Sequence, residues 1–185
     1  MRRLVRREEY FDTAMRVLAT GGPRDLKIGR LCRALEVTTG SFYGYFGSFD
    51  GFVGEFLAHW EASQTQRIVE IADKLADPAE RIHTVKELAG AMPHAAEAAI
   101  RSWAHHHPIV ADAQKRVDER RVAALTDILE AATENRDEAY RLALMGMTLL
   151  VGLQQWRSPI TKTDFDLIFD QYEQMVTSRL PRKKS

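Results

Sequence analysis

Hydroxyl-bearing side chains are concentrated in one short segment of this chain. Five of them lie within eight consecutive residues: Thr38, Thr39, Ser41, Tyr43 and Tyr45. Such hydroxyls hydrogen-bond phosphate oxygens without adding charge, and a threonine methyl group can contact a thymine methyl group. The same segment holds no Arg, Asn or Gln, the side chains that read base edges most strongly. Its chemistry therefore fits binding to DNA, with DNA shape carrying part of the sequence preference.

Two short helices joined by a tight turn are expected to position these hydroxyls. Residues 26–35 carry apolar side chains three and four positions apart, which is the pattern of one helix face. Only Glu36 and Val37 separate this helix from Thr38, whose hydroxyl can accept a backbone N–H and cap a second helix. This arrangement is typical of a helix-turn-helix, whose second helix enters a DNA major groove.

The second of these helices has two unlike sides. Phe42 and Phe46 are four residues apart and are expected to be buried together. The opposite side carries Gly40, Ser41 and Gly44, with the two tyrosines flanking them. A face of glycine and hydroxyl groups lets another surface approach closely. For the tyrosines, ordinary half-buried packing is the alternative.

The charge of the chain is balanced overall but unevenly distributed. Residues 1–50 hold nine basic and six acidic residues, whereas the remainder holds 17 basic and 20 acidic residues. Arg3 belongs to a cluster of four arginines near the chain start, which is either a solvated tail or an arm that binds phosphate or the minor groove. Lys27 is expected in the first turn of a helix, where the dipole disfavours a cation. A nearby phosphate would account for that placement, and so would chance.

Composition places the chain among folded proteins, since 45% of its 185 residues are apolar and 28% are charged. No apolar run reaches about 18 residues and no signal-type segment begins the sequence, so we expect no membrane span and cytoplasmic residence. Cys32 is the single cysteine, which excludes an internal disulfide. Its place on an apolar helix face favours a small buried hydrophobe over a reactive thiol.

Helix signals run along the whole chain, and no segment shows the alternation typical of strands. We therefore expect an all-α fold of about nine helices, with a compact N-terminal trio in residues 1–47 and a larger helical body in residues 48–185. Residues 133–137 are expected to form a loop, and Thr163, with Asp166 three residues on, to cap the last helix. The expected helices cover residues 8–19, 26–35, 38–46, 48–75, 78–92, 95–105, 108–132, 138–156 and 164–179.

The segment 138–156 differs from the other expected helices. Between Leu142 and Leu153 almost every residue is apolar, so this helix should be buried on two sides. One side would pack on the protein's own core and the other on a second subunit. Gly146 and Gly152 cost helix stability, about 1 kcal/mol each, which indicates that a neighbouring backbone comes close to them.

The first third of the chain resembles the DNA-binding domain of TetR-family transcriptional regulators of bacteria. The matching parts are a first helix ending at Gly22, the helix over 26–35, the turn and second helix over 37–46, and the start of a long helix over 47–52. The resemblance implies a homodimer that associates through residues 138–156 and 164–179. It also implies that each second helix enters one of two successive major grooves of a near-palindromic operator in double-stranded DNA.

DNA contacts are expected from the residues singled out above. They are Lys27, Thr38, Thr39, Gly40, Ser41, Tyr43, Tyr45 and Arg3. Of these, Ser41, Tyr43 and Tyr45 match family positions that hydrogen-bond phosphates. Two departures matter, because the family commonly has glycine where Glu36 stands and lysine where Phe49 stands. Both changes should weaken the electrostatic affinity for DNA.

The resemblance further implies that the body, residues 48–185, holds a small-molecule effector. Bulky apolar candidates for its pocket are Trp60, Met92, Trp103, Met145, Leu149 and Trp156. Taken singly, each of these is more often plain core. The run His105–His107 ends at Pro108 and has no Cys, Asp or Glu at ligand spacing, so we expect neither a metal nor a cofactor.

The leading hypothesis is therefore a ligand-responsive repressor that binds a pseudo-palindromic operator as a homodimer and is released by a small hydrophobic or amphipathic effector. The alternative is a DNA-binding activator or regulator whose body only dimerises or binds a protein partner. An enzyme is disfavoured, because the sequence shows no paired carboxylates in an apolar stretch, no Cys/His nucleophile pair and no glycine-rich phosphate loop.

Overall fold

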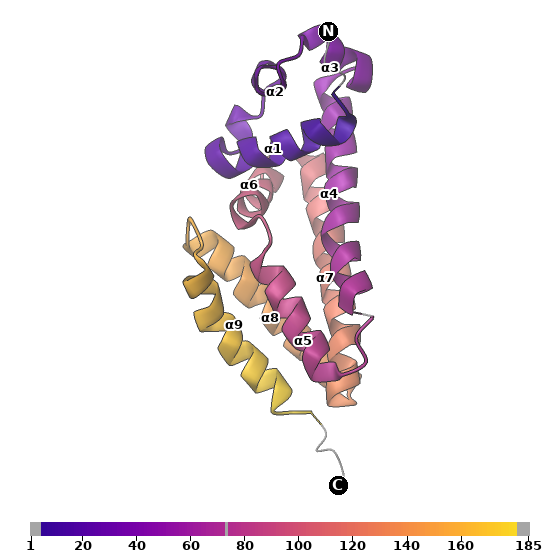
Figure 1. Ribbon diagram of the computed structural model, residues 1–185, viewed down its shortest axis with the longest axis vertical. Coiled ribbons are helices and arrows are strands. Elements are labelled where there is room, and N and C mark those ends of the chain that lie inside the picture. The colour runs from indigo at the N-terminus through magenta and orange to yellow at the C-terminus, as the bar shows by residue number, and fades with distance from the viewer. Residues whose placement is uncertain (1–4, 73, 181–185) are drawn as a thin grey trace. The chain divides into compact units, whose positions relative to one another are not determined.

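The protein is all-helical throughout the residues that its structure, a computed structural model, describes: 5–72 and 74–180, without the side chains of 64–67 and 69. These residues form nine α-helices and one short 3-10 helix, with no strand among them (Figure 1). The elements are α1 Arg7–Gly21, η1 Pro23–Asp25, α2 Ile28–Leu35, α3 Thr39–Phe46, α4 Phe49–Ala72, α5 Pro78–Gly90, α6 His94–Ala104, α7 Pro108–Thr133, α8 Arg136–Trp156 and α9 Lys162–Thr177. The expected all-α fold of about nine helices is confirmed.

Packing groups the chain into two compact units. The first comprises residues 1–62 and 93–115, and the second comprises residues 63–92 and 116–185. Helices α4 and α7 each begin in the first unit and end in the second. The predicted boundary after residue 47 differs from this division of the packing, and it stays a prediction.

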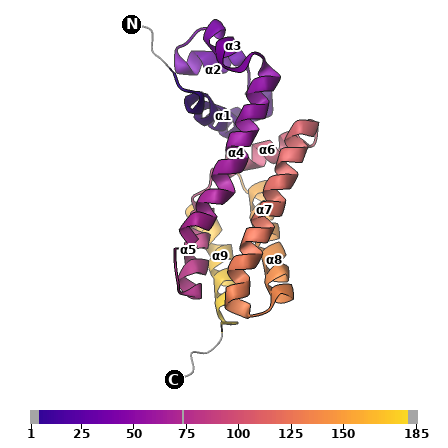
Figure 2. The same ribbon diagram turned by 90° about the vertical axis from the view of Figure 1, so that its right-hand side faces the viewer.

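Aromatic side chains from three helices form the core of the first unit. All are at most 6% exposed: Tyr10 and Phe11 of α1, Phe42 and Phe46 of α3, and Phe52 and Phe56 of α4. The Tyr10 ring lies edge-on to Phe42 and Phe46, with centroids 5.8 and 5.3 Å apart, an arrangement that aromatic rings favour. Figure 2 shows α1, α2 and α3 gathered at the start of α4. The cluster therefore fixes α3 against α1 and α4.

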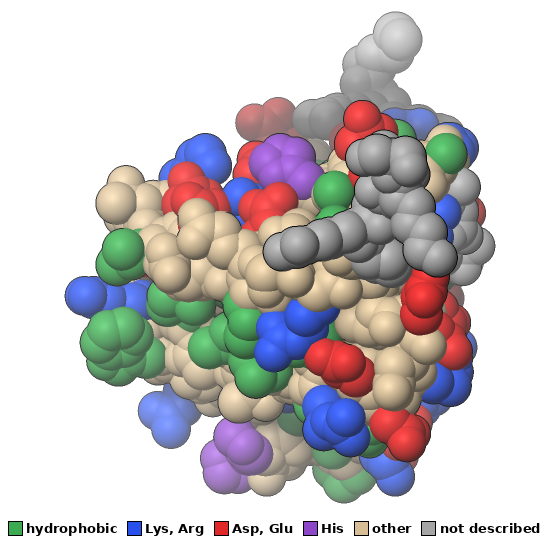
Figure 3. Space-filling model, turned by 90° about the horizontal axis from the view of Figure 1, so that it is seen from below, with side chains coloured by type: hydrophobic (Ala, Val, Ile, Leu, Met, Phe, Trp, Pro, Cys, Tyr) green, Lys and Arg blue, Asp and Glu red, His purple; other side chains and the backbone are tan. Residues whose placement is uncertain are grey.

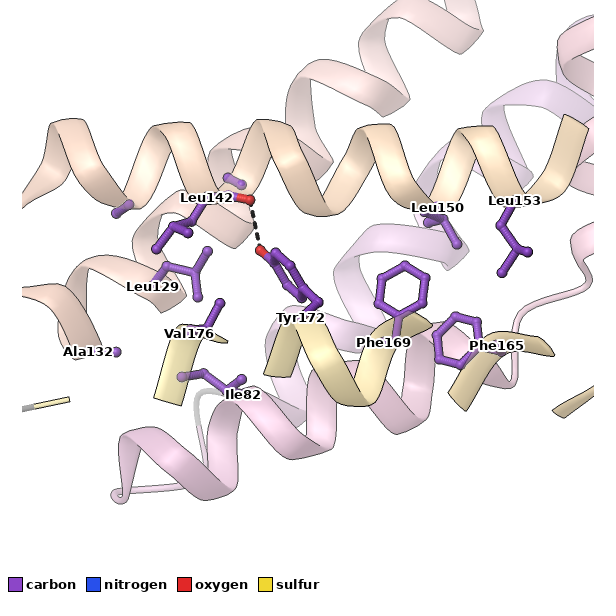
Figure 4. Packing of buried hydrophobic residues seen from close by; sticks show 12 residues of the cluster. Ile82, Leu129, Ala132, Leu142, Leu150, Leu153, Phe165, Phe169, Tyr172 and Val176 are labelled. Atoms are coloured by element: carbon purple, nitrogen blue, oxygen red, sulfur yellow. Dashed lines mark hydrogen bonds between the residues drawn. The ribbon is translucent and has the colours of Figure 1, made fainter. Parts of the chain in front are cut away.

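In the second unit, α8 and α9 pack against each other around one tyrosine. The Tyr172 hydroxyl donates a 2.7 Å hydrogen bond to the carbonyl oxygen of Leu142, as Figure 4 shows. Gly146 makes room for it, since a Cβ there would lie 2.8 Å from the Tyr172 hydroxyl oxygen. Phe165 and Phe169 stack with ring centroids 4.3 Å apart and point toward α8. The predicted close approach at Gly146 is thus made by a tyrosine ring of the same chain.

The predicted loop over residues 133–137 is present but shorter than expected, since only residues 134 and 135 lie between α7 and α8. Helix α7 continues to Thr133 and α8 already begins at Arg136. Glu134 adopts a left-handed conformation with φ 52°, and the Asn135 side chain accepts a backbone N–H and caps α8. A single left-handed residue followed by a capping side chain turns the chain here, so the polar composition of the segment does not require a longer loop.

The last helix is capped two residues earlier than expected. The Thr161 hydroxyl oxygen accepts the backbone N–H of Asp164 at 3.1 Å, and the Asp164 carboxylate accepts the backbone N–H of Thr161 at 3.1 Å and its hydroxyl at 2.7 Å. Thr163 lies inside the first turn. Both threonines have an aspartate three residues on, so the pattern alone does not choose between them. The helix begins at the earlier cap because each added residue brings a further hydrogen bond.

We expect Thr161→Ala to lower the free energy of unfolding by about 1 kcal/mol, because it removes this cap, and Thr163→Ala to change it little. Urea unfolding of the two variants measures the difference. Hydrogen bonds from Thr161 hold the Asp164 pKa below its ordinary value, so this capping stabilisation is present above the unfolded pKa. It should fade as the pH falls below about 4. Equal effects of the two substitutions at pH 7 would contradict the assignment.

Candidate nucleic-acid interface

A left-handed residue makes the turn between α2 and α3. Glu36 has φ 55° and ψ 41°, and the Val37 N–H donates to the carbonyl oxygen of Cys32 at 2.9 Å. The Thr38 hydroxyl oxygen then accepts the Ser41 N–H at 3.3 Å and caps α3. The predicted turn and cap are confirmed. Because a left-handed conformation costs a non-glycine residue about 1–2 kcal/mol, the position of Glu36 is one that favours glycine.

The side of α3 away from the aromatic cluster is exposed. Phe42 and Phe46 are buried, whereas the Tyr43 side chain is 51% exposed. Ser41 is half-buried at the edge of this surface. Five exposed residues form this surface, and all but Gly44 were predicted to contact DNA. We call the surface the α3 outer face: Thr38, Thr39, Gly40, Tyr43 and Gly44.

The fold itself does not require either glycine of the α3 outer face. A Cβ at Gly44 would meet nothing within 4 Å, and one at Gly40 would meet only the Thr38 hydroxyl oxygen, at an ordinary 3.7 Å. Glycine inside a helix costs about 1 kcal/mol relative to alanine. Two glycines in an eight-residue helix are therefore best explained by something that approaches the helix from outside.

Tyr45 differs from the expectation that its hydroxyl serves phosphate. That hydroxyl donates a 2.6 Å hydrogen bond to the carbonyl oxygen of Val5, in the segment that leads into α1. The Tyr45 ring is half-buried, with its centroid 5.9 Å from that of Tyr10. Tyr45 thus ties α3 to the start of α1, and Tyr43 is the tyrosine that the structure leaves on the outer face.

Basic side chains near this surface play different parts. The Arg7 guanidinium pairs with Glu55 and donates to the carbonyl oxygen of Tyr45 at 2.8 Å, so it is held within the unit. The hydrogen bond with Glu55 raises the pKa of Arg7. Lys27 is exposed and occupies the N-cap position of α2 rather than its first turn. Arg3 lies outside the described residues.

Two further positions bear on the charge of the surface. Arg33, in the last turn of α2, is exposed and was not among the predicted contacts. The sequence pattern could have indicated this residue, because Arg33 directly follows Cys32 of the apolar face and therefore lies off that face of the helix. Phe49 is half-buried, with its ring centroid 6.1 Å from that of Phe52. It extends the aromatic cluster and leaves that position without a cation.

The residues predicted to line an effector pocket are divided between the two units. Trp60 and Trp103 belong to the first unit, whereas the other four belong to the second. Trp60 is 1% exposed, and its indole N–H donates to a carboxylate oxygen of Glu97 at 2.9 Å. Trp60 is therefore a core residue of the first unit, with its one polar group satisfied.

The remaining four candidates occupy different parts of the second unit. Met145 and Trp156 are 44% and 71% exposed on α8. Leu149 and Met92 are partly buried against the core that α8 and α9 share. Of the six predicted residues, Met92 is the one that lines the apolar cavity of this unit. Bulk and hydrophobicity alone did not separate core, surface and cavity positions.

Other chemistry is sparse in the part of the chain that the structure describes. No group of three or more His, Cys, Asp or Glu side chains lies close enough there to hold a metal ion. Burial raises the pKa of the Cys32 thiol, as the buried-hydrophobe interpretation predicts. Among the described helices, none has the length and apolar character needed to cross a membrane.

This geometry defines the class of helix-turn-helix DNA-binding proteins. A model of the family described as "Bacterial regulatory proteins, tetR family" matches residues 11–55. No curated protein matches the chain.

Solved structures resemble the chain over nearly its whole length. A transcriptional regulator from Rhodococcus sp. has a TM-score of 0.77 at 16% identity, covering 95% of this chain and 98% of the other. A TetR-family regulator from Agrobacterium tumefaciens has a TM-score of 0.78 at 14% identity, covering 91% and 96%. The fatty acid degradation regulator FadR from Bacillus halodurans has a TM-score of 0.74 at 14% identity, covering 96% and 97%. At such identities the likeness establishes the fold.

Residues 11–55 therefore match the TetR family of bacterial regulatory proteins, and the fold of the chain is that of solved transcriptional regulators. The match includes the helix-turn-helix segment, which supports a role in DNA binding and transcriptional regulation.

We expect Glu36→Gly to raise the free energy of unfolding by about 1 kcal/mol, because glycine adopts the left-handed conformation without strain. Glu36→Gln is the matched control, since it removes the charge but keeps the strained backbone. Thermal unfolding should therefore separate the two variants, whereas DNA binding should improve in both because a negative charge is lost. Equal melting temperatures for the glycine and glutamine variants would contradict this account of the turn.

Proposed function

We propose that this regulator is a repressor that binds a pseudo-palindromic operator as a homodimer and is released by a small-molecule effector. The observation that carries the proposal is the α3 outer face, whose glycines suit close approach and are not needed by the fold. Thr38 and Thr39 stand at the start of α3, where a recognition helix meets base edges. Residues 1–47 form the DNA-binding domain in this proposal, and residues 48–185 form the effector-binding and dimerisation domain.

Contacts to phosphate supply much of the affinity in this proposal. Tyr43 and Ser41 offer donors on or beside the outer face, Lys27 offers an exposed ammonium at the N-cap of α2, and Arg3 and the segment around it would act as an arm. Tyr45 acts instead by positioning α3. Since the surface offers few cations, the dependence of affinity on salt should be shallow compared with that of a strongly basic regulator.

The dimer is proposed to form through the outer sides of α8 and α9. Five of the seven large hydrophobic side chains exposed in the described residues lie on these two helices: Tyr140, Leu144, Met145, Trp156 and Leu167. Figure 3 shows one face of the molecule, on which hydrophobic side chains reach the surface between charged ones. A Cβ at Gly152 would meet nothing within 4 Å, so this glycine leaves open space for a neighbour. Apolar surface concentrated in this way is typical of a protein interface.

The effector is proposed to act by changing how far apart the dimer holds its two α3 helices. Operator binding needs them about 34–36 Å apart, one turn of DNA. By linkage, operator DNA must weaken effector binding by the same factor by which the effector weakens DNA binding. A regulator whose body only dimerises or binds a protein partner would show no such reciprocal effect. Since this mode of action needs access to chromosomal DNA, we place the protein in the cytoplasm.

We expect Gly44→Ala to stabilise the free protein by up to about 1 kcal/mol and yet weaken operator binding roughly tenfold or more, because the added methyl group overpacks the contact with DNA. Fluorescence anisotropy on a duplex that the protein selects from random DNA measures the affinity. Gly54→Ala is the matched control, since this glycine of α4 also has open space around its Cβ position. It should stabilise the protein without changing DNA affinity. Wild-type affinity in Gly44→Ala would refute the close approach.

We expect Leu167→Glu to dissociate the dimer, because a charge would be buried without a partner at the proposed interface. The dissociation constant should rise about 100-fold or more, as measured by light scattering across a concentration series. Ile109→Glu is the control: Ile109 is 50% exposed but lies on α7, outside the proposed interface. A Leu167→Glu protein that remains dimeric at all concentrations would place the interface elsewhere.

A further inference from the structure

The second unit contains an apolar cavity of about 100 Å³. Five helices line it, from Ile68 of α4 to Phe169 of α9, and every lining residue belongs to this unit. Two of its lining residues are flexible methionines, Met92 before α6 and Met147 on α8. Apolar cavities can bind apolar ligands.

On the cavity wall, the carboxylate of Glu173 and the ammonium of Lys86 form an ion pair. The Lys86 ammonium lies 2.7 Å from carboxylate oxygens of both Asp170 and Glu173, and its side chain is only 10% exposed. Burial by itself would lower the pKa of Lys86, but the hydrogen bonds to these two carboxylates outweigh it and raise the pKa. His83 Nδ1 lies 2.8 Å from the second Glu173 oxygen. Lys86 is therefore not available to a ligand anion without breaking a buried pair.

The other polar groups of the wall are engaged as well. The Tyr172 hydroxyl donates to the carbonyl oxygen of Leu142, and burial raises its pKa, so it stays neutral. Arg121, the second cation, is 8% exposed and also interacts within the protein, although its buried Nε atom has no hydrogen-bond partner among the described residues. A ligand in this cavity would thus meet aliphatic and aromatic carbon and no uncommitted charge.

Size restricts the ligand further. A cavity of about 150 Å³ lined by aliphatic and aromatic side chains accepts one benzene molecule. The cavity here is smaller, and methionine side chains adapt their shape readily, so Met92 and Met147 can widen it by small rotations. A cavity volume between about 100 and 150 Å³ accommodates one six-membered ring but not a long acyl chain.

Resting on the proposed function, we infer that the effector is a small uncharged apolar molecule of monocyclic-hydrocarbon size, bound in this cavity of the second unit. Gly146, Met147 and Leu150 of α8 line the cavity, while Met145 and Trp156 of the same helix are exposed on its outer side. A ligand would therefore lie directly beneath the helix that carries much of the proposed dimer interface.

Methionine methyl NMR of the full-length protein tests the inference, with toluene and benzoate as a matched pair of probes. Toluene should shift the Met92 and Met147 methyl signals saturably and leave that of Met15, on α1 of the first unit, unchanged. Benzoate, which has the same ring with a carboxylate, should shift neither. No saturable shift at Met92 or Met147 up to the solubility of toluene, or tighter binding of benzoate, would overturn the ligand class.

Cavity-filling variants locate the site. Ala124→Leu, or Ala89→Leu should the first variant fail to fold, should abolish the toluene shifts because both alanines line the cavity. Ala123→Leu is the control, since this neighbouring alanine is exposed, and it should bind toluene as the wild type does. Toluene binding that survives both filling variants would overturn the site.

Operator affinity measured with and without toluene separates this inference from the proposed function. Release of DNA by toluene in the wild type, but not in Ala124→Leu, is the expected result. Toluene bound in the cavity without any change in operator affinity would overturn the cavity as the effector site while leaving operator recognition intact. Failure to bind any DNA sequence would instead overturn the proposed function.

Discussion

The burial of Phe42 and Phe46 is the constraint on which recognition by this protein depends. Helix α3 has only eight residues, and helices this short are not stable alone in water. Packing against Tyr10, Phe11 and the phenylalanines of α4 supplies the missing stability, since each large aromatic side chain in a core contributes about 3–5 kcal/mol. Because the packing of one side stabilises α3, the other side need not contribute to stability and can consist of glycine, threonine and Tyr43.

The second unit separates its tasks by helix face in the same way. On the inner side of α8, Gly146 admits the Tyr172 ring and the wall of the apolar cavity continues to Leu150. On the outer side, Met145 and Trp156 are exposed. A single helix therefore lies between the proposed ligand and the proposed partner subunit. Helix α4, which begins in the first unit and ends in the second, links the cavity residue Ile68 to the aromatic cluster.

The sequence predicted the helix order and the helix-turn-helix because both follow from apolar spacing and capping, which are local properties. It did not distinguish Thr161 from Thr163 as a cap, because both have the same residue pattern. Nor did it predict that the Tyr45 hydroxyl bonds to Val5, or that Trp60 is core while Trp156 is exposed. These outcomes depend on which distant segment packs against a helix, and the spacing of apolar residues within that helix carries no such information.

Methylation interference on a selected duplex tests the central claim most directly, because guanine N7 lies in the major groove. If a dimer places two α3 helices in successive major grooves, methylated guanines should block binding in two patches about 10 base pairs apart, related by the symmetry of the duplex. Interference confined to one patch, or to methylated adenines in the minor groove, would contradict the account.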